Sequence, residues 1–96
     1  MKTVLIDGRQ YDSVRAIHAF FAKTFDWPYY GHNTDALWDL LTTAVERPLT
    51  IKWINIDASR EQPGDEHRTL LNVLRRVEAW DQAHLKASER LHLVME

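Results

Sequence analysis

The sequence predicts an α/β fold in which a three-stranded parallel sheet is packed by three to four helices. Short apolar stretches rich in β-branched residues lie at the start, in the middle and at the end of the sequence. Amphipathic helical stretches separate them. Strands joined through helical crossovers are normally parallel, and the crossovers are right-handed. Because the chain has 96 residues, we expect one domain covering residues 1–96.

Three stretches are predicted as strands. The first is TVLIDG, which ends at the Asp7-Gly8 turn. The second is PLTIKWINI, residues 48–56, and the third is RLHLVME, residues 90–96. The polar residues 57–66, which follow the second strand, are expected to form a loop. Alternating apolar residues give each of the later strands an inner face: Leu49, Ile51 and Trp53, and then Leu91, Leu93 and Met95.

Three helices are predicted from apolar residues at helical spacing. The first covers residues 11–25, with Asp12 or Ser13 as its N-cap, and stops before a Trp-Pro pair. The second covers residues 34–45 with Asn33 or Thr34 as its cap, and the third covers residues 65–83. Each helix has a stripe of residues that is expected to face the core. In the first helix these are Val14, Ile17, Phe21 and Phe25, and in the second they are Leu37, Leu40, Leu41 and Ala44. In the third they are Leu70, Leu74, Val77 and Trp80 or Asp81.

Composition excludes several functional classes. Without cysteine, the chain has no disulfide, no thiolate catalysis and no cysteine-based zinc site. A net charge of −2 gives no argument for a nucleic-acid or membrane partner. The apolar run Val4 to Ile6 is too short for a signal peptide, and nothing approaches the about 20 apolar residues of a membrane span. We therefore expect a cytoplasmic protein without cofactor or metal, and its five histidines, which match no zinc motif, on the surface.

One segment combines acids and aromatics in an unusual way. Residues 26–46 contain four acids and no Lys or Arg, a formal charge of −4 against −2 for the whole chain. On a helix, four of its residues have the spacing i, i+3, i+4 and i+7 and form one side, here called the acidic stripe: Asp35, Trp38, Asp39 and Thr42. Two aspartates at i, i+4 repel each other, and Asp is a poor mid-helix residue. Carboxylates beside aromatic anchors are typical of a protein-binding surface, although core aromatics next to a solvated acidic face would give the same pattern.

Residues 28–53, PYYGHNTDALWDLLTTAVERPLTIKW, resemble the barstar family of intracellular inhibitors of barnase-like ribonucleases. The resemblance rests on the Tyr-Tyr-Gly turn, Asn33, the DALWD core of the helix, the Pro-Leu start of the next strand, and Trp53. It implies a non-catalytic inhibitor, monomeric when free, that occludes the basic active site of a bacterial ribonuclease one to one. The partner-binding residues that it implies are Tyr29, Tyr30, Gly31, Asn33, Asp35, Trp38, Asp39 and Thr42.

The resemblance also assigns roles within this set. Asp39 would mimic a substrate phosphate, Asp35 would support it at the rim, and Tyr29 would pack on the catalytic histidine of the enzyme. The chain departs from the family pattern at Ala44, where the family has an aromatic residue, and at Arg76, in a region where the family has an acid. These departures favour a diverged ribonuclease over barnase itself.

Two other functions remain open from the residues. A non-inhibitory adaptor would use the same acidic stripe to bind a basic protein that is not a nuclease. A small metal-dependent hydrolase would use Asp35 and Asp39 as paired carboxylates or as magnesium ligands. Nucleic acid is not expected as a partner, because the arginines are too sparse to form a basic patch.

Overall fold

The computed structural model describes residues 2–61 and 64–96. Its three strands form one parallel sheet with the order β1-β2-β3, which confirms the predicted fold class. The helices begin and end within a few residues of the predicted bounds. The elements in chain order are β1 (Lys2–Asp7), α1 (Val14–Thr24), α2 (Thr34–Thr43), β2 (Leu49–Ile54), α3 (Ile56–Arg60), α4 (Glu66–His84), a 3-10 turn η1 (Ala87–Glu89) and β3 (Leu91–Met95).

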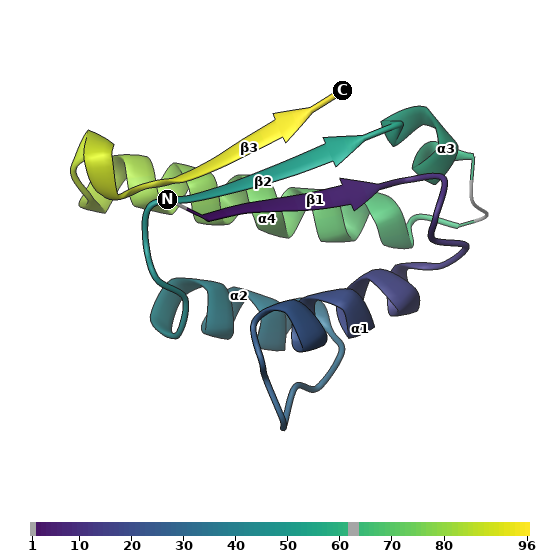
Figure 1. The fold of residues 1–96 in the computed structure, drawn as a ribbon, viewed down its shortest axis with the longest axis horizontal. Coiled ribbons are helices and arrows are strands. Elements are labelled where there is room, and N and C mark those ends of the chain that lie inside the picture. Colours follow the sequence, from purple (N-terminus) through teal and green to yellow (C-terminus); the bar gives the residue numbers. More distant parts are fainter. Residues whose placement is uncertain (1, 62–63) are drawn as a thin grey trace.

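The sheet buries one of its faces beneath the helices. Figure 1 shows α1, α2 and α4 on the same side of the sheet, as two successive right-handed crossovers in one direction require. Most side chains that alternate toward them are fully or almost fully buried, whereas Leu5 on the opposite face is 52% exposed. Leu93 and Met95, which were also expected on the inner face, are partly buried against the core. The buried strand residues are Val4, Ile6, Leu49, Ile51, Trp53 and Leu91.

The short helix α3 corrects the expectation that residues 57–66 form a loop. Asn55 turns the chain after β2 in the left-handed region, with φ of 53°, and its side-chain Nδ2 donates to Asp7 Oδ1 over 2.8 Å. The single turn is then anchored by Ser59, which is buried and accepts a hydrogen bond from Trp53 Nε1 at 3.0 Å. A polar composition conceals this helix because its anchor is a hydroxyl group rather than an apolar side chain.

The helix that carries the acidic stripe is held by the core. Leu37 and Leu41 of α2 are completely buried, and α2 packs against α4, which in turn packs against β3. The expectation that Ala44 also faces the core is wrong, because α2 ends at Thr43 and Ala44 is its exposed C-cap residue. Only the side of α2 that faces away from the core is therefore free to meet a partner.

Candidate functional site

The acidic stripe lies on the outer side of α2. Asp35 and Asp39 are exposed, while Trp38 and Thr42 are half-buried. Within residues 2–61 and 64–96, neither carboxylate forms an ion pair. Both charges are thus directed to solvent and available to a cation brought by another molecule.

Asn33 fixes the start of this helix. Its Oδ1 accepts a hydrogen bond from the backbone N–H of Ala36 at 2.8 Å, so Asn33, rather than Thr34, is the N-cap. Its Nδ2 also donates to the carbonyl of Gly31 at 3.2 Å. A Cβ at position 31 would stand 3.0 Å from that same Nδ2, so a larger residue would press on the cap. Asn33 and Gly31 together set the direction in which the preceding loop enters α2.

That loop, residues 29–33, presents one tyrosine outward and one inward; we call it the Tyr-Tyr-Gly loop. Tyr29 is 98% exposed, whereas Tyr30 is 7% exposed. The ring of Tyr30 packs on Trp27 with centroids 5.2 Å apart, and its hydroxyl group donates to the carbonyl of Asn33 at 3.4 Å. In Figure 1 the connection between α1 and α2 projects away from the sheet. Tyr30 therefore anchors the loop to the core, while the side chain of Tyr29 is exposed to solvent.

His18 of α1 completes this support, which corrects the expectation that all five histidines lie on the surface. It is 4% exposed, and its Nδ1 is hydrogen-bonded to the hydroxyl group of Tyr30. Burial lowers the pKa of His18, with a smaller contribution from the charge of His32, and burial raises the pKa of Tyr30. Both side chains are consequently uncharged at neutral pH. Their pairing spans twelve residues, so helical spacing alone does not reveal it.

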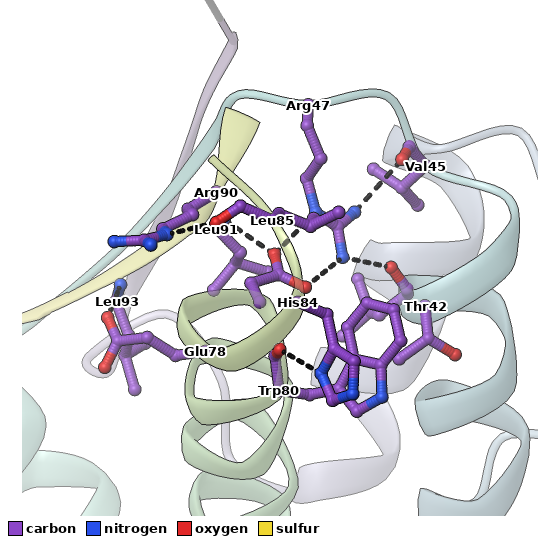
Figure 2. A network of polar contacts seen from close by, with 12 residues as sticks. Thr42, Val45, Arg47, Glu78, Trp80, His84, Leu85, Arg90, Leu91 and Leu93 are labelled. Carbon is purple, nitrogen blue, oxygen red and sulfur yellow. Dashed lines mark hydrogen bonds and ion pairs between the residues drawn. The ribbon is translucent and has the colours of Figure 1, made fainter. Parts of the chain in front are cut away.

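The other end of α2 is held by an ion pair that the sequence patterns do not predict. Arg47 Nε donates to Asp81 Oδ2 at 2.7 Å, and Arg47 Nη2 donates to the carbonyl of Leu41 at 2.6 Å. Asp81 is fully buried on α4 and also accepts from the backbone N–H of Leu91 at 2.8 Å. Figure 2 shows Arg47 extended between the end of α2 and α4. The pair therefore connects α2, α4 and β3, and the signal for it was an acid at a core-facing helical position.

Two kinds of structure are absent from the described part of the chain. Among residues 2–61 and 64–96, no three His, Asp or Glu side chains lie close enough together to hold a metal ion. Asp35 and Asp39 thus have no third described ligand beside them. In the same ranges, no helix is both long enough and apolar enough to cross a membrane.

The helix α2, with its acidic stripe, and the Tyr-Tyr-Gly loop thus lie on the helical side of a three-stranded parallel sheet. The family model for barstar, described as barnase inhibitor, matches residues 1–94 of this chain. The chain belongs to the barstar family, which confirms the resemblance in residues 28–53. A protein of Bacillus subtilis (strain 168) named "Putative ribonuclease inhibitor YrdF" is 37% identical to it over 75 residues, which cover 77% of this chain and 82% of that protein.

Proposed function

We propose that this protein inhibits a bacterial barnase-like ribonuclease by covering the basic active site of the enzyme with the acidic stripe and the Tyr-Tyr-Gly loop. One observation carries the proposal. Asp35 and Asp39 stand exposed on either side of Trp38, on a helix whose opposite side is fixed in the core, and neither pairs with a described residue. Membership of the barstar family and the name of the Bacillus relative support a ribonuclease as the partner.

The chemistry of the partner explains why exposed carboxylates suit this role. A ribonuclease binds the phosphates of RNA with positively charged side chains, so its active site attracts an acidic helix before contact. Once water is expelled, Asp39 forms charge-assisted hydrogen bonds with those cations, and Asp35 forms them at the rim. Because the attraction acts over distance, added salt should reduce the association rate more than it raises the dissociation rate.

The remaining residues of the interface contribute shape and hydrogen bonds. Tyr29 is free to pack on the catalytic histidine of the enzyme. Thr42 donates its hydroxyl hydrogen to the carbonyl of Trp38 at 2.7 Å, which leaves the hydroxyl oxygen able to accept from a partner. Tyr30 lies below the surface and takes part by holding the backbone of Gly31 and its neighbours in place.

In this proposal the protein has no catalytic residue and requires no cofactor. Residues 1–96 act as a single domain, monomeric when free, which forms a one-to-one complex with the enzyme. The complex forms in the cytoplasm, where an active ribonuclease would otherwise degrade the RNA of the cell.

The test is a titration of RNA cleavage by a panel of small bacterial ribonucleases, including any encoded beside this gene. The parent should inhibit one member stoichiometrically, and Asp39→Ala should weaken that complex by about 2–5 kcal/mol, because a buried cation of the enzyme loses its partner. Asp57→Ala is the control, since Asp57 is also an exposed acid and belongs to α3, which lies away from α2 in Figure 1. Circular dichroism checks that both variants are folded.

Two outcomes would contradict the proposal. Equal inhibition by the parent and by Asp39→Ala would remove the helix from the mechanism. Failure of the folded parent to inhibit any ribonuclease, together with capture of a basic non-nuclease protein through Asp39, would favour the adaptor instead.

A further inference from the structure

Arg76 of α4 places a positive charge at the border of the acidic stripe. Its guanidinium carbon lies 4.9 Å from the centre of the Trp38 ring, a cation–π contact. Trp38 in turn follows Asp35 by three residues on α2 and directly precedes Asp39. Arg76 is exposed, and in the part of the chain that the structure describes it forms no ion pair. The indole therefore holds in place a cation that has no described acidic partner.

The position of Arg76 follows from the packing of the two helices. Because α2 contacts α4 directly, a side chain on the adjoining side of α4 can reach across to Trp38. The preceding residue, Arg75, takes a different course, since its Nη2 lies 3.8 Å from Met95 Sδ on β3. Of two consecutive exposed arginines, only Arg76 adjoins the acidic stripe.

A partner that covers Trp38 must also cover Arg76, because the guanidinium lies over the indole. Burying a cation without a counter-charge is strongly unfavourable. The indole occupies one flat side of the guanidinium, and the N–H groups at its edge still require acceptors. A carboxylate suits this edge best, since it can accept two parallel hydrogen bonds from an arginine.

The neighbouring charges distinguish between possible sources of an anion. A nucleic acid would bring further phosphates close to Asp35 and Asp39, which repel them. A protein can instead place a single carboxylate opposite Arg76 and cations opposite the two aspartates. The mixed charge of this surface therefore fits a protein with a basic site and an acidic residue at its edge.

We propose that Arg76 determines specificity by binding an Asp or Glu carboxylate at the rim of the ribonuclease active site. This inference rests on the proposed function and adds to it the chemistry of the preferred enzyme. Ribonucleases with an acid at that rim position are accepted, and those with a basic residue there are rejected by repulsion from Arg76.

Charge substitutions test the proposal against the ribonuclease that the parent inhibits most tightly. Arg76→Ala should weaken inhibition by about tenfold or more, because a charged hydrogen-bonded pair is lost, and Arg76→Glu should weaken it further. Arg75→Glu, the same charge change one residue earlier, should alter inhibition less than about twofold. The thermal midpoint of each variant checks that the fold is unchanged.

A cross-linking experiment identifies the opposing group. A water-soluble carbodiimide activates a carboxylate, and the amine introduced by Arg76→Lys then displaces the urea to form an amide bond. We expect a one-to-one cross-link from Arg76→Lys, but not from Arg75→Lys, that mass spectrometry maps to an Asp or Glu of the enzyme. Replacing that acid with Ala in a double-mutant cycle with Arg76→Ala should reveal coupling, which a purely structural role of Arg76 would not produce.

The outcomes separate this inference from the proposed function. If Arg76→Glu binds as tightly as the parent or more tightly, while Asp39→Ala still weakens the complex, then Arg76 does not meet a carboxylate and only the present inference fails. If Asp39→Ala inhibits as well as the parent, the proposed function fails and the role of Arg76 fails with it.

Discussion

The buried pair of Arg47 and Asp81 allows a quantitative test of how α2 is held. The Arg47 side chain is 11% exposed and that of Asp81 is fully buried, so removing either partner leaves the other charge without compensation in the interior. We expect Asp81→Leu and Arg47→Met each to reduce the free energy of unfolding by about 3–5 kcal/mol. Asp81→Leu also leaves the backbone N–H of Leu91 without its acceptor. We therefore expect the destabilisation by Asp81→Leu to lie in the upper part of that range.

The double variant Arg47→Met/Asp81→Leu distinguishes the ion pair from ordinary packing. Because neither charge remains buried, the double variant should cost no more than one of the single changes, which corresponds to a coupling of about 3 kcal/mol. It should not fully recover the stability of the parent, since the carbonyl groups of Leu41 and Val45 also lose the guanidinium that binds them.

Urea denaturation followed by tryptophan fluorescence measures these free energies, provided that the m-value is the same in all variants. The matched control is Glu96→Gln, which breaks the ion pair between Lys52 and Glu96 over 3.5 Å. Because those side chains are 40% and 57% exposed, we expect a change below about 1 kcal/mol. If the effects of the single changes are additive, or if Asp81→Leu costs less than about 1 kcal/mol, the buried ion pair does not hold α2.

Two further predictions concern the support of the Tyr-Tyr-Gly loop and the start of α2. Because burial lowers the pKa of His18, the unfolded chain binds a proton more readily than the folded one, and stability should fall as the pH decreases from about 7 through the ordinary value of about 6.5. Unfolding measured between pH 7 and 5 should show this slope in the parent and a reduced slope in His18→Gln; identical slopes would contradict it. Asn33→Ala should lower the free energy of unfolding by about 0.5–2 kcal/mol, because the backbone N–H of Ala36 loses its acceptor. Asn33→Asp should retain most of the stability of the parent, since Asp also caps helices. Equal stability of all three proteins would contradict the capping role.

Features that depend on local periodicity could be predicted from the sequence. Alternation in the second strand placed Leu49, Ile51 and Trp53 in the core, where the structure finds them fully buried. Helical spacing placed Asp35 and Asp39 on one side of a helix, and both are exposed. These patterns are readable because a strand repeats every two residues and a helix every 3.6, whatever lies around them.

Tertiary structure alone decided how the polar and aromatic residues of the site are partnered. Outside regular elements no periodicity exists, so only the tertiary structure shows that Tyr30 turns inward, toward His18, while Tyr29 turns outward. Asp81 is separated by 34 residues from Arg47, whose guanidinium supplies the counter-charge for the buried carboxylate. A buried polar group is stable only with a partner, and that partner can come from any part of the chain. The sequence therefore determined which residues form the acidic stripe, and the fold determined what holds it in place.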